Sequence, residues 1–368
     1  MEQKKALIVP LNWGLGHTTR LVPVIRELIS QNVLVYFGGS PEQISMVKNE
    51  YPGVLGLSFP VLTVWFGDRK WRFLYFFLQL PGFFLQIYRE HRSLKKLVEK
   101  EHIDLVISDN AYGLWCDRTY TILITHQLNI SLPGSLRFLQ TLVSRLIYKI
   151  VVKYNECWVP DFEKKPNLTG ELSAPPRMPT NVSFIGILSR FDMLALKYMN
   201  IAAEKDRVLI LLSGPEPQRS HFERLIQKQL QELTLNYHIC VVRGLPGKGL
   251  TNDPVWINHL PAEALAQLIC RSEFIICRSG YSTIMDLVTL NRTALLVPTP
   301  GQTEQEYLAD YLVERGLFCS IKQMDFQLDR AIDLLKSACS KNDYSEYRKE
   351  NFSLNILQNR IRECLIKC

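Results

Sequence analysis

The chain has 368 residues, of which 47% are hydrophobic and 21% charged, and it carries a formal net charge of +7. This length predicts two globular domains, because a domain usually holds roughly 100–200 residues. The mild positive charge suits an anionic ligand but is no signature of nucleic-acid binding. No apolar run reaches the roughly 20 residues of a membrane-spanning helix or forms a secretory leader. The nine cysteines are scattered without a Cys-x-x-Cys pair, so we expect reduced thiols, a cytoplasmic location and no zinc site.

The first half of the chain alternates apolar strands with amphipathic helices. It opens with a strand at residues 6–11, a turn that contains glycine and a helix at 21–30. Further strands are predicted at residues 33–37, 104–108, 121–125 and 157–159. This βαβα order predicts a parallel sheet with helices on its faces.

The turn after the first strand holds Gly14, Gly16 and His17. It is similar to a dinucleotide-binding fingerprint only superficially, because Thr19 replaces the third glycine and no acidic residue ends the second strand. NAD binding is therefore not expected. His17 follows the carboxyl end of the strand, where open α/β sheets bind ligands, and a neutral imidazole there is suited to deprotonate an acceptor hydroxyl. The alternative is a histidine that caps a helix or is buried in the core.

Polar residues also follow two later strands of this half. Asp109 and Asn110 come after one strand, and His126 comes after the next. Because the carboxyl ends of parallel strands lie at one edge of a sheet, we expect these side chains near the same crevice as His17. Asp109 is then a candidate to orient the imidazole in a catalytic dyad.

Residues 65–97 are rich in aromatic and basic side chains. One interpretation is a pair of core helices broken at Pro81-Gly82, with a solvated basic end. The other is an element that lies on a membrane surface or accepts a lipid-linked substrate, because aromatic rings together with Lys and Arg favour an anionic interface.

Residues 164–181 are rich in proline, glycine and polar side chains and form the best candidate linker. They would separate an N-terminal domain, residues 1–163, from a C-terminal domain, residues 182–343. In the C-terminal part the pattern starts again, with strands at 207–212, 237–242, 274–277 and 293–297. Residues 344–368 are expected to form terminal helices, with packing back onto the N-terminal domain as one option.

The stretch 274–287 is the most informative part of the chain. It is typical of a buried strand, a tight turn at Ser279-Gly280 and a helix start that Ser282 or Thr283 can cap. Such a corner presents free backbone N–H groups and the positive end of a helix dipole, which suit an anion. Asp286 follows one turn inside, where a carboxylate can accept hydrogen bonds from sugar or ribose hydroxyls. The alternative is an ordinary strand–turn–helix corner of an α/β sheet.

Two successive α/β domains with a cleft between their sheets describe the GT-B glycosyltransferase architecture. One stretch of the chain resembles the donor-binding half of the MurG family and the signature of the broader UDP-glycosyltransferases. It contains, in this order, Cys277-Arg278-Ser279-Gly280, Thr283, Asp286 and the segment 294–307. That family transfers N-acetylglucosamine from UDP-N-acetylglucosamine to a lipid-linked acceptor. The resemblance extends over the whole chain in order and is specific over residues 274–307.

The amino-terminal half resembles these families less strongly. The turn Gly14-Leu15-Gly16-His17 is similar to their glycine-rich turn and histidine, and residues 126–129 are loosely similar to a His-Glu-Gln-Asn segment of MurG. The resemblance implies that His17 lies by the reacting centre, as the acceptor-side base or as a diphosphate contact. The residues placed with it on the acceptor side are Gly14, Gly16, Asp109, Asn110 and His126.

On the donor side the resemblance assigns a role to each matching residue. Arg278 would stabilise the leaving phosphate, and Asp286 replaces a family glutamate that holds the ribose hydroxyls, although its side chain is one methylene shorter. The diphosphate would face Ser279, Gly280, Ser282 and Thr283. The base would lie near Leu260, and the donor sugar near Gln302, Glu304 and Gln305.

The chain departs from the family at Ser213-Gly214-Pro215-Glu216-Pro217, where the family has a glycine-rich turn. Two prolines remove backbone donors, and the carboxylate of Glu216 would repel a phosphate. Arg219 is a candidate to compensate for this repulsion. Ser213 and Gly214 remain the expected donor contacts of this turn.

The resemblance implies an inverting transferase that uses a UDP-sugar as co-substrate and needs no metal, since the chain has no Asp-x-Asp motif. Helix N–H groups would stabilise the leaving phosphate instead. Two rivals stay open: a UDP-sugar 2-epimerase of the same fold, and a catalytically degenerate subunit that binds a nucleotide sugar. Nucleic acid is not an expected partner, whereas a membrane surface is. The donor sugar, the acceptor and the oligomeric state are not readable from these residues.

Overall fold

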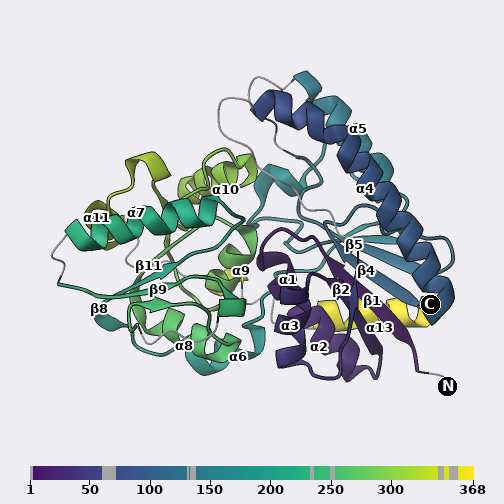
Figure 1. Ribbon diagram of the computed structural model, residues 1–368, viewed down its shortest axis with the longest axis horizontal. Coiled ribbons are helices and arrows are strands. Elements are labelled where there is room, and N and C mark those ends of the chain that lie inside the picture. Colours follow the sequence, from purple (N-terminus) through teal and green to yellow (C-terminus); the bar gives the residue numbers. More distant parts are fainter. Residues whose placement is uncertain are drawn as a thin grey trace. The chain divides into compact units, whose positions relative to one another are not determined.

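The computed structural model describes residues 3–59, 72–130, 132, 138–232, 236–248, 253–338, 344–347 and 355–368. The chain forms two compact units, whose positions relative to one another are not determined (Figure 1). The first unit comprises Met1–Trp13, Leu21–Gly186 and Phe352–Cys368, and the second comprises Gly14–Arg20 and Ile187–Asn351.

The first unit is built on a parallel sheet with the strand order β3-β2-β1-β4-β5-β6-β7 (Figure 1). Its strands are β1 (Lys5–Pro10), β2 (Leu34–Gly39), β3 (Leu55–Ser58), β4 (Leu105–Asp109), β5 (Tyr120–Ile124), β6 (Glu156–Val159) and β7 (Val182–Phe184). Its helices are α2 (Val22–Ser30), α3 (Pro41–Glu50), α4 (Arg72–Glu101), α5 (Gln140–Val151) and α13 (Asn355–Lys367), with a 3-10 turn at Gly170–Ser173.

The second unit repeats this plan with the order β10-β9-β8-β11-β12-β13, again parallel. Its strands are β8 (Glu204–Leu211), β9 (His238–Val242), β10 (Trp256–Ile257), β11 (Ser272–Cys277), β12 (Leu295–Leu296) and β13 (Cys319–Ser320). Its helices are α1 (Gly16–Arg20), α6 (Asp192–Tyr198), α7 (Gln218–Glu232), α8 (Ala262–Arg271), α9 (Tyr281–Thr289), α10 (Thr303–Glu314) and α11 (Leu328–Ala338). Short 3-10 turns lie at Pro246–Lys248 and Gln323–Asp325.

Both sheets place their first strand in the middle and then extend to either side, which is the doubly wound arrangement. In such sheets the ligand crevice lies outside the carboxyl ends of the two strands where the order reverses. These strands are β1 and β4 in the first unit and β8 and β11 in the second. The predicted fold class, two Rossmann-like parallel-sheet domains, is confirmed.

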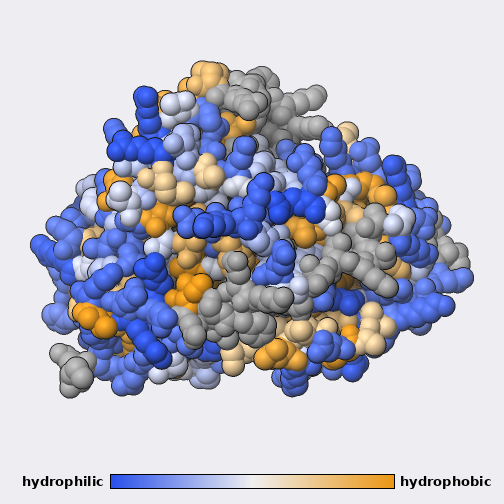
Figure 2. All heavy atoms as spheres, turned by 180° about the vertical axis from the view of Figure 1, so that it is seen from behind, coloured by the Kyte–Doolittle hydropathy of each residue, from blue (hydrophilic) through white to orange (hydrophobic). Residues whose placement is uncertain are grey.

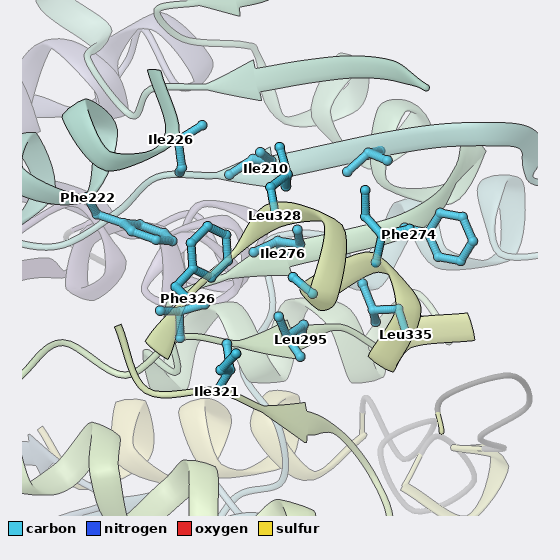
Figure 3. Packing of buried hydrophobic residues seen from close by; sticks show 14 of the residues in the cluster. Ile210, Phe222, Ile226, Phe274, Ile276, Leu295, Ile321, Phe326, Leu328 and Leu335 are labelled. Carbon is cyan, nitrogen blue, oxygen red and sulfur yellow. The ribbon is translucent and has the colours of Figure 1, made fainter. Parts of the chain in front are cut away.

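The core of the second unit fixes the helices that frame this crevice. One face of the sheet, with Ile210 and Ile276, packs against Phe222 of α7 and Leu328 of α11 (Figure 3). The rings of Phe222 and Phe326 meet edge to face with centroids 5.2 Å apart. Burying a side chain of this size contributes about 1.5–3 kcal/mol each. The start of α7 is therefore held rigidly beside the end of β8.

The predicted domain boundary differs from the structure. Val182–Phe184 pairs with β6, so β7 belongs to the first sheet and not to the C-terminal domain. The predicted linker, residues 164–181, is also part of the first unit. The reason is Asp161, whose buried carboxylate accepts hydrogen bonds from the backbone N–H groups of Phe162, Leu168 and Thr169. Proline and glycine here shape an ordered loop, and the units are joined at Gly186–Ile187.

One helical expectation also needs correction. The predicted break at Pro81-Gly82 is wrong, because α4 continues through both residues from Arg72 to Glu101. Its carboxyl-terminal half is held by Leu94 and Val98, which are buried in the first core. The part of the aromatic and basic segment at residues 65–71 lies outside the described residues. The terminal segment divides, since Tyr344 to Tyr347 belong to the second unit and α13 to the first.

No helix in the described ranges is long and apolar enough to cross a membrane. On the face shown in Figure 2, the apolar residues form small patches between hydrophilic ones. Among the cysteines of the described ranges, seven are free, but Cys319 is disulfide-bonded, which departs from the expectation of reduced thiols throughout.

Candidate functional site

The corner between β11 and α9 has the features of an anion site. Gly280 is the N-cap of α9, with φ −73° and ψ 133°, and no side chain caps the helix. An added Cβ on Gly280 would meet no atom within 4 Å, so open space lies in front of the first helical turn. The N–H groups of a first helical turn and the positive end of the helix dipole suit a negatively charged ligand.

The loop after β12 is tied to this corner. The Ser279 hydroxyl donates to the backbone carbonyl of Gln305 at 2.8 Å, and both residues are buried. The Thr299 N–H donates to the side-chain oxygen of Gln305 at 2.9 Å. Gln302 is the N-cap of α10, and that helix also starts without a side-chain cap. Ser279 and the Gln305 amide oxygen thus hold the two helix starts together, rather than being freely available to a ligand.

Arg278 belongs to the core, which contradicts its predicted role at the leaving phosphate. It is buried and donates to the backbone carbonyls of Val297, Pro298 and Gln218, and to the side chain of Gln323 at 2.7 Å. Its guanidinium also lies 4.2 Å from the ring centre of Phe222. Burial lowers the pKa of Arg278 to about 9.

Asp286 is likewise engaged within the unit, and its predicted ribose contact is not supported. Its carboxylate accepts hydrogen bonds from Ser189 Oγ at 2.6 Å and from Arg190 Nε at 3.2 Å. Burial raises the pKa of Asp286, and Arg190 and Ser189 oppose this shift. The shorter side chain therefore anchors the start of the second unit, the segment 187–191.

The corner between β8 and α7 differs from that at α9. Gly214 has φ +102°, which favours glycine, and an added Cβ there would meet no atom within 4 Å. Next to it, the carboxylate of Glu216 accepts hydrogen bonds from Ser220 N–H at 3.2 Å and Arg219 Nε at 2.7 Å. Burial alone would raise the pKa of Glu216, but these hydrogen bonds from Ser220 and Arg219 outweigh it and lower the pKa.

The chain thus supplies its own anion to the start of α7. Arg219 is buried and paired with Glu216 and Glu223, and its predicted compensation for the Glu216 charge at a phosphate stays a prediction. Ser213 and Gly214 stay predicted contacts at the end of β8.

His17 is placed by the short helix α1, which belongs to the second unit. Gly14 before it has φ +74°, and the backbone carbonyl of Gly16 accepts a hydrogen bond from Ser282 Oγ at 2.9 Å. Ser282 therefore joins α1 to the first turn of α9, while Thr283 follows it in that turn. The Nδ1 atom of His17 lies 3.0 Å from Nη2 of Arg20.

Sequence reasoning missed Ser189, Arg190 and His259. His259 precedes Leu260 in the loop after β10, and burial, followed by the charge of Arg190, lowers the pKa of His259. Their position in the chain could have identified them, because each of these polar residues lies at a unit boundary or just after a strand. Glu304 lies half-buried in the first turn of α10.

In the first unit, the predicted acceptor-side residues follow neighbouring strands. Asp109 pairs in register with Ile124, so the ends of β4 and β5 lie side by side. Asp109, Asn110 and His126 are all buried, and Asn110 has φ +53° with a buried Oδ1 that has no hydrogen-bond partner. His17 and Asp109 belong to different units, so their predicted dyad stays a prediction. Within the described residues, no group of three or more His, Cys, Asp and Glu side chains is arranged to hold a metal ion.

A family model for the glycosyltransferase family 28 C-terminal domain matches residues 220–361. The match begins within α7, runs through the rest of the second unit and reaches α13 of the first unit. It covers the α9 corner and the start of α10, so the region that is similar to family 28 contains both uncapped helix N-termini described above. The predicted resemblance of the donor half is confirmed.

Relatives of the chain include enzymes named UDP-N-acetylglucosamine–N-acetylmuramyl-(pentapeptide) pyrophosphoryl-undecaprenol N-acetylglucosamine transferase. The one from Haemophilus influenzae is 21% identical over 93% of this chain and 92% of its own length. The one from Acidiphilium cryptum is 25% identical, and there the chain spans only about half of the relative, 56% of its length.

Solved structures show the same fold at low identity. The glycotransferase of kitacinnamycin has a TM-score of 0.63 at 14% identity, over 99% of this chain and all of the other. Acinetobacter baumannii MurG has a TM-score of 0.56 at 14% identity, over 98% of this chain and 99% of its own. The family match, the relatives and the fold together support a MurG-like GT-B glycosyltransferase.

Proposed function

We propose that the protein transfers a hexosyl or N-acetylhexosaminyl group from a UDP-sugar to an acceptor hydroxyl. The observation that carries the proposal is the uncapped N-terminus of α9, with open space before Gly280, inside the region that is similar to family 28. The relatives are named for UDP-N-acetylglucosamine as donor, which supports a UDP-sugar here.

The proposed reaction breaks the bond between the anomeric carbon and the diphosphate oxygen, and that oxygen keeps the electron pair. The acceptor oxygen forms the new bond from the opposite face, which inverts the anomeric centre, and its proton goes to a base. The N–H groups of Gly280 to Thr283 would stabilise the negative charge that develops on the departing diphosphate. Asp109 and His17 are the two candidates for the base.

The donor sugar would be bound at the start of α10. Gln302 and Glu304 flank Gln305, whose amide oxygen is fixed by Thr299 N–H. With one lone pair of that oxygen engaged, the Gln305 side-chain NH2 group is suited to donate hydrogen bonds to a sugar, while the carboxylate of Glu304 can only accept them. This pairing suits a sugar that presents both hydroxyl and carbonyl oxygen atoms.

We also propose that the protein works at the cytoplasmic face of a membrane as a peripheral enzyme, on a lipid-linked or cell-envelope acceptor. An apolar stripe is exposed to solvent at the start of α5: it consists of Phe138, just before the helix, and of Leu142 and Leu146 within it, so that its side chains recur every fourth residue. Exposed basic residues, Arg145 and Lys149, lie on the same helix. This combination favours an anionic lipid surface.

The membrane proposal is tested by sedimentation with anionic and neutral vesicles. The double variant Leu142→Ser/Leu146→Ser should bind anionic vesicles at least about tenfold more weakly. Each substitution removes the roughly 2 kcal/mol of binding free energy that burying a leucine side chain in the lipid interface contributes. Leu196→Ser is the matched control, since Leu196 is also exposed but lies on α6. Equal binding of the parent and the double variant would contradict the proposal.

The transfer itself is tested by release of UDP from UDP-sugars, with and without a lipid-linked acceptor. Transfer requires that UDP release depends on the acceptor. Conversion of the donor sugar without any acceptor would favour the 2-epimerase, whereas UDP binding without turnover would favour a degenerate binding subunit. The hydrogen bond from Ser220 N–H to the Glu216 carboxylate at the start of α7 is the observation that supports this last alternative.

A further inference from the structure

We infer that Arg20 fixes His17 as a hydrogen-bond donor to the diphosphate of the sugar donor, so that His17 is not the base. The inference rests on the proposed function and deepens it. It assigns Arg20, which no sequence motif singled out, as a positioning residue of the donor site.

The assignment follows from the chemistry of the two side chains. Nη2 of Arg20 lies within hydrogen-bond distance of Nδ1 of His17, at 3.0 Å. A guanidinium can only donate, so Nδ1 must offer its lone pair. In a neutral imidazole one nitrogen carries the proton, and this proton is then on Nε2.

Arg20 cannot easily release this contact. Its side chain is only 2% exposed, and it lies three residues after His17, where side chains on a helix meet. A base would need a free lone pair at Nε2. That tautomer places the proton on Nδ1, against the N–H of Arg20, where two donors face each other.

The position of α1 shows which ligand group this donor serves. Ser282, in the first turn of α9, donates to the carbonyl of Gly16 at 2.9 Å. The contact is so close that an added Cβ on Gly16 would lie 3.2 Å from Ser282 Oγ. His17 therefore follows directly after the residue that is bound to the proposed anion site. An Nε2–H group there joins the backbone donors of α9 in binding the diphosphate.

The acceptor proton must then go elsewhere. Asp109, the buried last residue of β4, is the remaining candidate among the predicted catalytic residues. His17 neither gains nor loses a proton, and only strengthens its hydrogen bond as the diphosphate leaves.

The tautomer can be observed without any substitution. In the parent protein labelled with ¹⁵N-histidine, long-range ¹H–¹⁵N spectra separate the protonated from the unprotonated ring nitrogen, and His17→Gln assigns the signals. We expect the Nε2–H form in the free protein and with UDP bound. The Nδ1–H form, with UDP binding intact, would overturn the inference and leave the proposed function standing.

Matched substitutions test the role. A glutamine places an amide N–H near the position of Nε2, whereas asparagine reaches only the position of Nδ1. His17→Gln should retain transfer within about tenfold of the parent, while His17→Asn should lose roughly 10- to 100-fold, as expected for a lost hydrogen bond to a charged group. If His17 were the base, both variants would fall equally, by roughly 100- to 10,000-fold.

Binding measurements separate the diphosphate from the nucleoside. His17→Asn and Arg20→Met should each weaken UDP binding at least about tenfold and leave uridine binding within about twofold. Arg20→Lys, which keeps a cationic donor, should restore part of the UDP affinity. An equal loss of affinity for UDP and for uridine would contradict a contact between His17 and the diphosphate. A parent protein that binds neither would instead refute the proposed function itself.

Discussion

Glu216 and Gly280 determine, as single residues, what the two helix starts beside β8 and β11 can bind. The Glu216 carboxylate is hydrogen-bonded to the first turn of α7, which is then occupied by an internal anion. Gly280 leaves the first turn of α9 open. One carboxylate and one missing side chain thus leave the start of α9, rather than that of α7, open to a phosphate group.

Gly280→Ala tests this directly. The residue has φ −73°, which alanine adopts without strain, and no atom lies within 4 Å of the added Cβ. We expect unfolding stability to be unchanged or about 0.4–1 kcal/mol higher, because alanine has less freedom in the unfolded chain. UDP affinity should fall at least about tenfold, because the methyl group occupies the space before the N–H groups. Calorimetric titration with UDP measures the loss.

Gly53→Ala is the matched control, since its added Cβ also meets no atom within 4 Å and it belongs to the first unit. It should leave UDP affinity unchanged. If Gly280→Ala bound UDP as the parent does, the anion site would not be at the start of α9.

Asp286→Asn separates anchoring from ribose binding. The change removes the charge that pairs with Arg190, and breaking a buried pair costs roughly 3–5 kcal/mol. We expect about 3 kcal/mol lower unfolding free energy in urea, since Arg190 is partly exposed. Both carboxylate oxygens are engaged within the unit, so the preference for UDP over its 2′,3′-dideoxy analogue should not change. A collapse of that preference would show that Asp286 contacts the ribose.

Among the elements, α13 takes the predicted option of packing back onto the amino-terminal part of the chain. It lies against the first unit, where Ile361 and Cys364 are buried and Lys367 Nζ lies 3.0 Å from the carboxylate of Glu156. Burial alone would raise the pKa of Glu156, but hydrogen bonds from Trp158, Tyr120 and Lys367 outweigh it and lower the pKa. The last helix is therefore held by a polar contact at the amino-terminal end of β6, opposite the edge where ligands bind.

This contact predicts a pH dependence of stability. A carboxyl group whose folded pKa is lowered adds stability above its unfolded pKa, about 4.3, and this is lost as pH falls through the folded pKa. Urea denaturation should therefore show Glu156→Gln to be less stable than the parent at pH 7, with the gap closing below about pH 4. Lys367→Met should reduce the same gap. Parallel stability curves for the parent and Glu156→Gln would contradict the assignment.

For the whole molecule, periodicity was sufficient to predict two parallel-sheet units and the corner at Ser279-Gly280. Both depend on patterns within short stretches, namely an apolar strand followed by a tight turn and a helix start. The partners of Arg278 and Asp286 were not predictable, because they come from distant segments. Gln323 follows Arg278 by 45 residues, and Ser189 precedes Asp286 by 97. The domain boundary failed for the same reason, since Asp161 turns a proline-rich segment into an ordered loop.

The central claim is that this two-unit chain binds a UDP-sugar through the region that is similar to family 28. The most direct measurement is a thermal-shift screen of the full chain with UDP, UDP-sugars, GDP, TDP and NAD. A ligand present at about 100 times its dissociation constant should stabilise the folded protein by about 2.7 kcal/mol. The account predicts such a shift for UDP and at least one UDP-sugar, and a smaller one or none for the other nucleotides. Stabilisation by none of these nucleotides would contradict it.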